Sequence, residues 1–341
     1  MEYRVVDNQK NNTLGRVQMK KFTKLALVSS LAISANAMAM QAMDDASLGA
    51  TTGQDGINIG IGISKIEIEK LFIHDNDGLA AGSLTAGQAG FGGTGEAGAI
   101  YIKGTGTGIT ATNGIVIGAN YDNGGAYLLP TRNLADLKID SDAGGGNPFI
   151  NIAAEVSGLD IHIGEIGVVA SGDVPAAGAA TIRRGGQGTE NAILTGLSVK
   201  TGPMTANIQL GAAPQGAMIK LNATMVGGLT ITDLGILDNS TKTTTRAAGV
   251  IHLDSIQVTD ASSRDLTLNQ SISVFGEEGA DKGYVRIVST SGAHDTYVKG
   301  IHLGSKTAAS IGDMEVQGMQ TYFSPAQGVY MPGAIITIRG H

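Results

Sequence analysis

The chain contains no cysteine and no tryptophan, and only 4% of its 341 residues are aromatic. The absence of cysteine excludes disulfides and thiol catalysis, so stability has to come from apolar burial and strand pairing. Charged residues make up 16% of the chain, below the roughly 25% of an average soluble domain. Apolar residues make up 42%, which is enough for a core even though the chain has 51 glycines. We therefore expect a folded chain rather than a disordered one.

Long apolar runs are also missing, apart from one near the N-terminus. Residues 25–34 form an apolar stretch behind the basic segment 19–24, and Ala35-Asn36-Ala37 supplies an A-x-A cleavage site. This layout predicts a signal peptide over residues 19–37, with residues 1–18 as an upstream extension. No later segment is apolar for long enough to form a membrane helix. The sequence thus predicts an exported protein, in the periplasm, at the outer membrane surface or in an extracellular fibre.

Basic charge is scarce once the predicted signal peptide is removed. The remaining chain has 17 basic and 28 acidic residues. Nucleic-acid recognition needs a basic face that neutralises phosphates. We therefore expect no nucleic-acid partner.

One apolar pattern changes phase halfway and then recurs. In "IGISKIEI", Ile61 and Ile63 alternate with other residues, and the next apolar pair is Ile66 and Ile68. Similar copies occupy residues 161–168, 229–236 and 251–258. The links carry one charged residue each, namely Lys65, Glu165, Asp233 and Asp254. Local spacing of two and β-branched residues indicate strands. We interpret each copy as a strand bent by one extra residue, so that both halves face inward; chance recurrence in an Ile-rich chain is the alternative.

The remaining pattern is that of an all-β protein. Plain strands are expected at 217–225, 265–274, 284–288 and 333–341, and no helix is expected after the signal peptide. Residues 173–191 are expected to form a loop, and residues 80–126 a Gly-rich insertion. The copies are unequally spaced, which disfavours a fixed-period array. We predict one domain over residues 38–341, an elongated, irregular curled sheet that resembles either a β-solenoid or an open β-sandwich.

The search for chemistry finds no catalytic or cofactor site. Gly90 to Gly95 match G-x-G-x-x-G but lack the flanking strand and helix that a dinucleotide site needs. Asp75 and Asp77 are a calcium candidate, although the other ligands of an EF-hand loop are missing and an Asx turn explains the segment better. His162 and His252 occupy polar positions of the bent pattern and are expected to face away from the core. We expect no enzyme, no cofactor and no other metal ligand.

The segment behind the signal peptide resembles a known family. Residues 40–78, "MQAMDDASLGATTGQDGINIGIGISKIEIEKLFIHDNDG", are similar to the start of exported gammaproteobacterial proteins of the pilus assembly protein FilA group, and the closing "IITIRGH" is similar too. The resemblance implies an exported protein of surface-fibre assembly, with chaperone, usher or fibre subunits as partners. The chain departs from a chaperone–usher pilin because it is about twice as long and has no disulfide.

Two functional hypotheses follow. The first is a structural protein of a pilus or of the outer envelope that assembles through β-edges. The candidate segments are 57–63 and 333–339, with Ile57, Ile59, Ile61, Ile336 and Ile338 as interaction residues. The alternative for these segments is that both are closed into the protein's own sheet.

The second hypothesis is a surface adhesin or glycan-binding module. Glycan sites often use exposed aromatic side chains. Tyr101, Tyr121 and Tyr127 lie together beside the Gly-rich zone and are the candidates for that role.

Overall fold

The structure is a computed structural model that describes residues 56–340 apart from 81, 83–84, 88–90 and 277–282. The chain divides into two compact units, Met1–Asp55 and Gly56–His341, and the description below concerns the second. The predicted upstream extension and signal peptide lie outside the described residues. Within the described part of the chain, no helix has the length and apolar character needed to cross a membrane.

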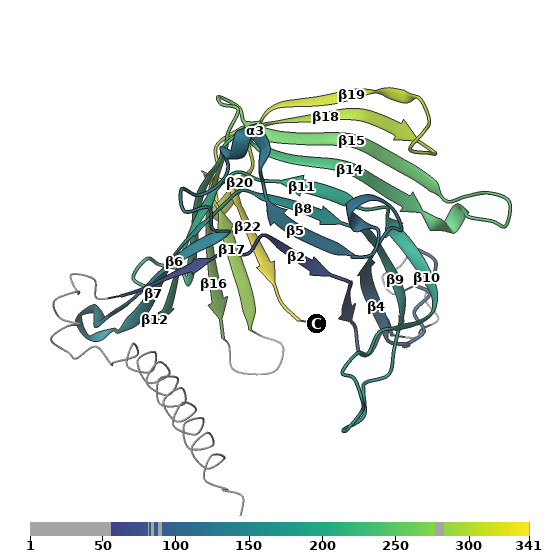
Figure 1. The fold of residues 1–341 in the computed structure, drawn as a ribbon, viewed down its shortest axis with the longest axis horizontal. Coiled ribbons are helices and arrows are strands. Elements are labelled where there is room, and N and C mark those ends of the chain that lie inside the picture. Colours follow the sequence, from purple (N-terminus) through teal and green to yellow (C-terminus); the bar gives the residue numbers. More distant parts are fainter. Residues whose placement is uncertain (1–55, 81, 83–84, 88–90, 277–282, 341) are drawn as a thin grey trace, which may run out of the picture. The chain divides into compact units, whose positions relative to one another are not determined.

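The first large sheet has eight strands in the order β1-β6-β7-β12-β13-β16-β17-β22 (Figure 1). Their bounds are β1 (Ile57–Ile61), β6 (Ala135–Asp142), β7 (Phe149–Val156), β12 (Met204–Gly211), β13 (Ile219–Met225), β16 (Leu266–Phe275), β17 (Tyr284–Ser289) and β22 (Ala334–Ile338).

The second large sheet has twelve strands, nine of them in the order β2-β5-β8-β11-β14-β10-β9-β4-β3. Strand β15 pairs with β14 and β18, and β18 pairs with β19. The bounds are β2 (Lys65–Ile68), β3 (Lys70–His74), β4 (Gly98–Lys103), β5 (Ile115–Ala119), β8 (Leu159–Ile163), β9 (Glu165–Ser171), β10 (Gly186–Leu194), β11 (Leu197–Lys200), β14 (Leu229–Asp238), β15 (Gly249–Asp260), β18 (His294–Leu303) and β19 (Ser310–Met319).

The other regular elements are short. Strands β20 (Tyr322–Ala326) and β21 (Val329–Pro332) form a two-stranded sheet. The helical elements are single turns, α3 (Asp122–Gly125), η2 (Gly108–Thr110), η3 (Gly144–Gly146) and η4 (Asn239–Thr241). The predicted all-β class is confirmed. Every strand pairing in the two large sheets is antiparallel, which is the pairing of an open sheet rather than of the parallel coils of a solenoid.

The plain strands predicted from alternation are confirmed as β13, β16, β17 and β22. The predicted loop over residues 173–191 is wrong in its last part, because β10 begins at Gly186. That part of the loop lacks a β-branched apolar run, and its strand pairs with β9 through an irregular register. Pairing with a neighbour thus overrides a weak local preference.

The phase change in the apolar pattern marks a line of kinks across the twelve-stranded sheet. We call this line the crease and define it by Gly164, Gly196, Asp233, Asp254 and Gly300. Gly164 separates β8 from β9, and Gly196 lies between β10 and β11. Asp233 in β14 has a φ of 63°, and Gly300 in β18 has a φ of 66°. Each kink therefore continues in the neighbouring strand, and the whole sheet bends along one line.

The predicted mechanism of the bend needs correction. Pairing of β14 with β15 keeps one register on both sides of Asp233 and Asp254, so no extra residue is inserted there. At Asp233 the bend comes instead from backbone in the left-handed region, whereas the pairing of β18 with β19 does shift register beside Gly300. The first copy of the pattern is not a bent strand at all. Ile61 ends β1 in the eight-stranded sheet, and β2 begins at Lys65 in the other sheet.

Few apolar side chains are completely buried. The clearest cluster consists of Ala99, Tyr101 and Val169, with Phe72 packed against it. Tyr101 is 1% exposed and donates its hydroxyl to Glu165 Oε1 at 2.9 Å. It fits because Gly167 lies beneath the ring, where a Cβ atom would come within 2.4 Å of Tyr101 Cζ. Most aliphatic side chains of the sheets are instead half-buried or exposed.

Candidate functional site

The two segments predicted to carry interactions form the two outer strands of the eight-stranded sheet. Ile57, Ile59 and Ile61 belong to β1, and Ile336 and Ile338 belong to β22. Strand β1 pairs only with β6, and β22 only with β17, among the strands that the structure describes. Each segment therefore joins the protein's own sheet along one side and is an outer strand among those that the structure describes.

Isoleucines lie opposite one another across all eight strands of this sheet. The row runs Ile57, Ile139, Ile152, Ile208, Ile219, Ile272, Ile287 and Ile336, each paired in register with the next. Cross-strand neighbours of this kind contact one another on the sheet face. We call this set the isoleucine row. It starts in one edge strand and ends in the other.

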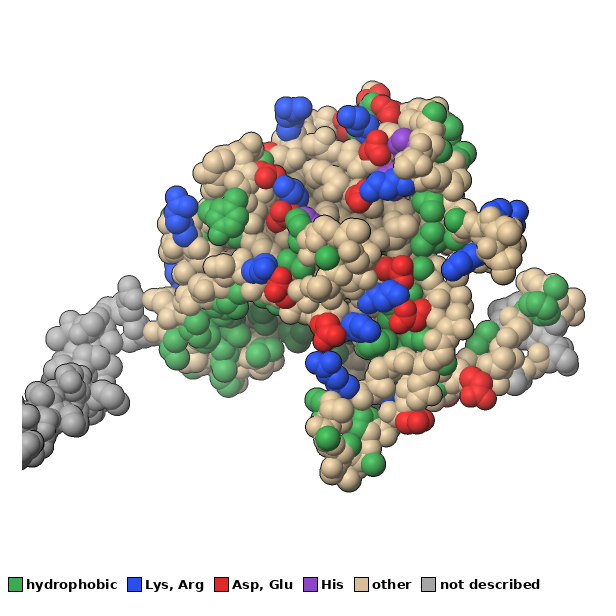
Figure 2. Space-filling model, turned by 45° about the vertical axis from the view of Figure 1, so that its right-hand side comes forward, with side chains coloured by type: hydrophobic (Ala, Val, Ile, Leu, Met, Phe, Trp, Pro, Cys, Tyr) green, Lys and Arg blue, Asp and Glu red, His purple; other side chains and the backbone are tan. Residues whose placement is uncertain are grey.

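The edges are apolar and exposed. Ile57 is 61% exposed, Ile336 52% and Ile338 56%. Neither β1 nor β22 contains a charged residue or a proline within its bounds, the devices that proteins use to keep edges from pairing. Figure 2 shows acidic and basic side chains intermixed over the face in view, and hydrophobic side chains gathered beside a hollow on its lower side. The two edges thus have the composition of strands that pair with a partner.

The hydrogen-bond phase shows which backbone groups face outward. Thr290 donates its N–H to Asn269 O at 2.8 Å, one position beyond the β16–β17 ladder. Because paired types alternate along an antiparallel ladder, Ile272 and Ile287 form a non-hydrogen-bonded pair. Ile287 therefore directs its backbone groups to Ile336.

The phase carries through to both edges. A residue that turns its backbone groups toward one neighbouring strand turns them away from the other. Ile336 thus bonds to β17, and the outward-facing groups of β22 belong to Ile335 and Thr337. By the same alternation Ile57 faces β6, and Gly60 of β1 faces outward. Gly333 also faces outward, but its N–H already donates to Thr321 O at 2.8 Å.

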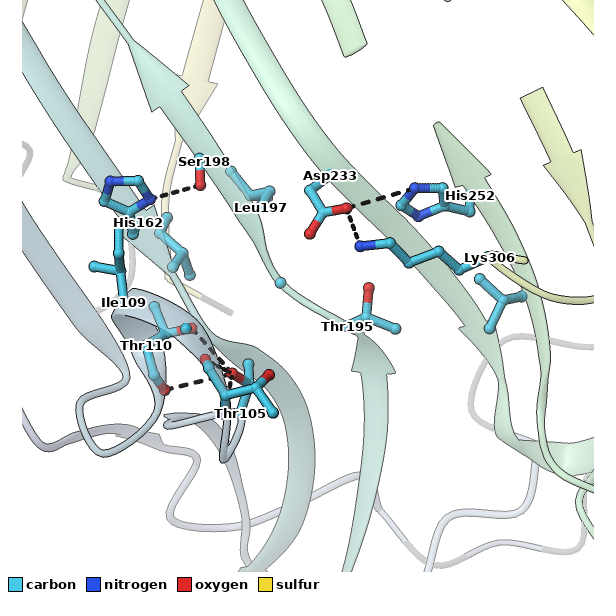
Figure 3. Close-up of a pocket in the computed structure, with 15 residues that line it drawn as sticks. Thr105, Ile109, Thr110, His162, Thr195, Leu197, Ser198, Asp233, His252 and Lys306 are labelled. Atoms are coloured by element: carbon cyan, nitrogen blue, oxygen red, sulfur yellow. Dashed lines mark hydrogen bonds and ion pairs between the residues drawn. The ribbon is translucent and has the colours of Figure 1, made fainter. Parts of the chain in front are cut away.

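A second candidate site is a polar pocket at the crease, with a volume of about 360 Å³ (Figure 3). Its lining comes from the loop around η2, from β8, β11, β14 and β15, and from the segment that follows β18. The residues are Thr105, Thr107, Gly108, Ile109, Thr110, His162, Ile163, Thr195, Gly196, Leu197, Ser198, Asp233, Val250, His252 and Lys306.

Charged groups meet on one side of this pocket. Lys306 Nζ contacts the Asp233 carboxylate, and His252 Nε2 lies 3.5 Å from Asp233 Oδ1 (Figure 3). Asp254 Oδ1 lies 3.5 Å from His252 Nε2 and 3.3 Å from His302 Nε2. His252 is 2% exposed, so the prediction that it faces away from the core is wrong. In the sheet it is paired with Gly235 of β14 on one side and with His302 of β18 on the other.

The surroundings of His252 and His302 shift their pKa values in opposite directions. Burial lowers the pKa of His252, and the nearby charge of Lys306 lowers it further. The pKa of His302 is raised, mainly because its Nδ1–H donates to Ala308 O at 2.6 Å, with Asp254 adding to the effect. At neutral pH the site therefore holds a neutral His252 beside a His302 that binds a proton more readily.

Another polar set crosses β8 and β11. His162 Nδ1 lies 2.7 Å from Ser198 Oγ, and His162 Nε2 lies 3.1 Å from Asp160 Oδ1. A serine nucleophile also needs N–H donors aimed at the developing oxyanion. Ser198 is paired with strands on both sides, which commits its own backbone to the sheet. We interpret the set as a polar ladder on the sheet face.

The remaining candidates lie elsewhere. The N–H of Asp77 donates to Asp75 Oδ1 at 3.4 Å, the contact of an Asx turn. Among the described residues no group of three or more His, Asp or Glu side chains is arranged to hold a metal. Tyr101 is buried and cannot stack on a glycan, so its prediction as a glycan-binding residue is wrong. Tyr121, in contrast, is 64% exposed. Tyr127 is half-buried and accepts from Asn123 Nδ2 at 2.7 Å.

Sequence reasoning located the edges but missed the pocket and the isoleucine row. Alternation at 57–61 and 334–338 was a direct signal for both outer strands. The row depends on register between paired strands as far apart in the sequence as Ile57 and Ile139, and the pocket unites residues from six segments. Only the changed apolar spacing near Gly164, Asp233 and Asp254 pointed toward the crease.

Residues 19–143 match the profile of a family of unknown function, DUF6160. The match covers a little over a third of the chain and includes β1 to β6. Neither a curated protein nor a solved structure matches the chain.

Proposed function

We propose that this protein is an exported structural or assembly component of a surface fibre, such as a pilus, or of the outer envelope. It acts through contacts made by the edges of its eight-stranded sheet. Its partners are other assembly proteins, namely a chaperone, an usher or fibre subunits. The signal-like segment at 19–37 and the resemblance of residues 40–78 to the FilA group support export and fibre assembly.

The observation that carries this proposal is the position of β1 and β22 as the two outer strands of one sheet. Both are apolar, uncharged and exposed along their side chains. A strand that adds to such an edge gains main-chain hydrogen bonds and buries alternate side chains. Natural proteins seldom leave a long apolar edge strand exposed unless another strand pairs with it.

The energetics favour use of the edges. A half-exposed isoleucine gains on the order of 1 kcal/mol when a partner strand covers it. The isoleucines of β1 and β22, three in each strand, therefore provide apolar contact for association, with backbone hydrogen bonds fixing the register. The excess of acidic over basic residues, 28 against 17 after residue 37, favours solubility of the unassembled chain.

The test introduces a charge at each edge. Ile57→Lys and Ile338→Lys are made separately, because both side chains are more than half exposed and tolerate lysine in the monomer. Cells are fractionated into periplasm, outer membrane and sheared surface material, and co-purifying assembly proteins are identified by mass spectrometry. We expect the variants to leave the envelope and surface fractions and to lose the chaperone, usher or subunit partners.

Ile182→Lys is the matched control. Ile182 is 94% exposed and lies outside both edge strands, so the same charge there should change neither distribution nor partners. Circular dichroism checks that each variant keeps its β-structure. Edge variants that fractionate and co-purify like the control would refute the proposed function.

A glycan-binding role is the second candidate, and the crease pocket is the observation that favours it. Hydroxyls of Thr105, Thr110, Thr195 and Ser198 line it together with Asp233 and Lys306. Such a mixture of donors and acceptors suits a polyhydroxyl ligand. Thr195→Val should weaken binding to labelled glycans, and the exposed Thr245→Val should not; equal binding by both variants would remove this candidate.

A further inference from the structure

We propose that the aliphatic faces of the two large sheets are the walls of an open groove that binds the acyl chain of a lipid molecule. The groove lies on the faces of the sheets and not at their outer strands, so this inference goes beyond the proposed function. Three observations carry it, namely the short links between the sheets, an aliphatic row in each wall, and burial that decreases away from the links.

The two sheets are joined along one line. At six places a strand of one sheet leads into a strand of the other through two to five residues, as where Val156 ends β7 and Leu159 begins β8. In sheet order, β1, β7, β12, β13, β16 and β17 are linked in this way to β2, β8, β11, β14, β15 and β18. We call this line of links the seam. Figure 1 shows the strands of the two sheets leaving it in different directions.

Each wall carries an aliphatic row that runs across its strands, alongside the seam. In the eight-stranded sheet this is the isoleucine row. In the twelve-stranded sheet a second row, again paired in register from strand to strand, consists of Ile66, Ile117, Ile161, Val199, Ile231, Ile256, Val298 and Met314. Because neighbouring strands lie about 4.8 Å apart, each row is about 34 Å long.

Burial shows that the two aliphatic faces lie on the inner side of the fold at the seam. Leu266, at the seam end of β16, is 7% exposed, whereas Val274, on the same face at the far end of that strand, is 59% exposed. In the other wall Val298 is 4% exposed, and Tyr297 beside it, on the opposite face, is 42% exposed. The walls therefore close on each other at the seam and separate away from it. Figure 2 shows the hollow beside which hydrophobic side chains gather.

The chemistry of the walls identifies the occupant. Neither row contains a charged or an aromatic residue. An alkyl chain complements such walls, because it carries neither charge nor a hydrogen-bonding group that would lose its water. Half of a bilayer's hydrocarbon core, the depth of one acyl chain, is about 15 Å. One chain therefore fits along either row.

A second copy of this chain is a poorer occupant. To fill a concave surface it would have to offer a convex aliphatic one. The face of the eight-stranded sheet opposite the isoleucine row carries charged side chains instead, among them Lys138, Lys220 and Arg286. Burying these charges against aliphatic walls would be costly.

Binding of palmitic acid to the full chain, below the concentration at which the acid aggregates, tests the groove. Ile150→Gln changes the groove face of β7, where Ile150 is 44% exposed and paired with Leu210. Ile335→Gln is the matched control, since Ile335 is 36% exposed on the opposite face of the same sheet. We expect Ile150→Gln to weaken binding several-fold and Ile335→Gln to bind like the parent. Equal affinities of the two variants would overturn the inference.

Chain length separates recognition of the alkyl chain from recognition of the carboxylate. Octanoic, dodecanoic and palmitic acids are compared on the parent chain. Each methylene group that enters the groove adds apolar burial, so affinity should rise several-fold with every two methylene groups. Equal affinity for octanoic and palmitic acid would contradict a groove that binds the alkyl chain.

Photo-cross-linking locates the bound chain. Palmitic acid with a diazirine near its methyl end is bound and irradiated, and labelled peptides are identified by mass spectrometry. We expect labels in β7, β12 and β16 and in strands of the second row. Labels confined to residues 1–55 would refute the groove, because they would place the acid on the N-terminal segment.

Two further results would also overturn the inference. The first is binding to phosphatidylglycerol vesicles without uptake of monomeric palmitic acid, which would indicate a membrane surface as the partner. The second is a parent chain that binds no palmitic acid but forms a dimer that Ile150→Gln abolishes, as measured by analytical ultracentrifugation. That result would mean that a second copy covers the groove.

Discussion

At the scale of single residues, a few buried polar contacts hold an otherwise open all-β structure. The tyrosine hydroxyl of Tyr101 is the clearest, because its ring is 1% exposed and its hydroxyl donates to Glu165. Burial and that hydrogen bond raise the pKa of Tyr101, so the group stays protonated at any physiological pH. Glu165 also contacts Lys103, at 3.1 Å, which joins the hydroxyl to a surface ion pair.

Removing this hydroxyl should destabilise the fold measurably. We expect Tyr101→Phe to lower the free energy of unfolding by about 1–2 kcal/mol, since a carboxylate loses a hydrogen bond. Urea denaturation followed by circular dichroism measures the change. Tyr121→Phe is the control, because Tyr121 is exposed and should unfold like the parent; equal midpoints for the two variants would disprove the buried contact.

The crease histidines should give opposite pH effects. The pKa of His302 is raised from 6.5, so its contribution to stability is complete below about pH 6.5 and is lost as the pH rises through the folded value. The pKa of His252 is lowered, so its contribution is complete above that pH and is lost as the pH falls. NMR titration should show His302 binding its proton at higher pH than His252. The reverse order would contradict the arrangement with Ala308 and Lys306.

At the scale of elements, the glycines of the crease lie where the structure leaves no room for a side chain. A Cβ atom on Gly164 would lie 2.2 Å from Lys103 O, which is backbone and cannot move aside. Gly300 combines a φ of 66° with a site where a Cβ atom would meet Asp254 Oδ2. Glycine is therefore required at both positions for different reasons.

Substitution of Gly164 should strain the junction of β8 and β9. We expect Gly164→Ala to cost about 1–3 kcal/mol, the usual penalty of overpacking. Gly98→Ala in the neighbouring β4 is the control, because the nearest atom to its Cβ would be 4.0 Å away. Thermal unfolding of both variants compares them. Equal melting temperatures would mean that the sheet does not bend at this glycine.

The isoleucine row should differ in energy between its middle and its ends. Ile208 in β12 is half-buried, whereas Ile57 in β1 is 61% exposed. We expect Ile208→Ala to cost about 1–2 kcal/mol and Ile57→Ala less than about 0.5 kcal/mol in the isolated protein. Dilute urea titrations measure both costs. A larger loss for Ile57→Ala would place that residue in a packed interior instead of at an edge.

The alternation of apolar residues predicted the strands themselves better than it predicted which strands pair with one another. Alternation in 217–225 and 284–288 gave β13 and β17, because every second residue faces the same side of a strand. The same pattern misread Ile61 to Ile68 as one strand, since periodicity carries no information on which sheet a strand joins. His252 was misplaced because its burial depends on β14 and β18 on either side, and distant pairing leaves no local signal.

At the scale of the whole molecule, the described chain is a set of antiparallel sheets with broad aliphatic faces and little complete burial. The outer strands of the eight-stranded sheet are the positions where such a structure meets a partner. Fibre assembly through an edge is a proposal with one physical requirement. It needs the outer side of an edge strand such as β22 to be open in the monomer and paired in the assembly.

Amide hydrogen exchange at single-residue resolution tests this requirement most directly. In dilute protein the amides of Ile335 and Thr337 should exchange rapidly, and the amide of Ile336, which bonds to β17, should exchange slowly. In the assembled material all three should exchange slowly, because a partner strand binds the outward-facing groups. If Ile335 and Thr337 exchange at the same rapid rate in dilute and assembled protein, the edge is not the site of assembly and the account fails.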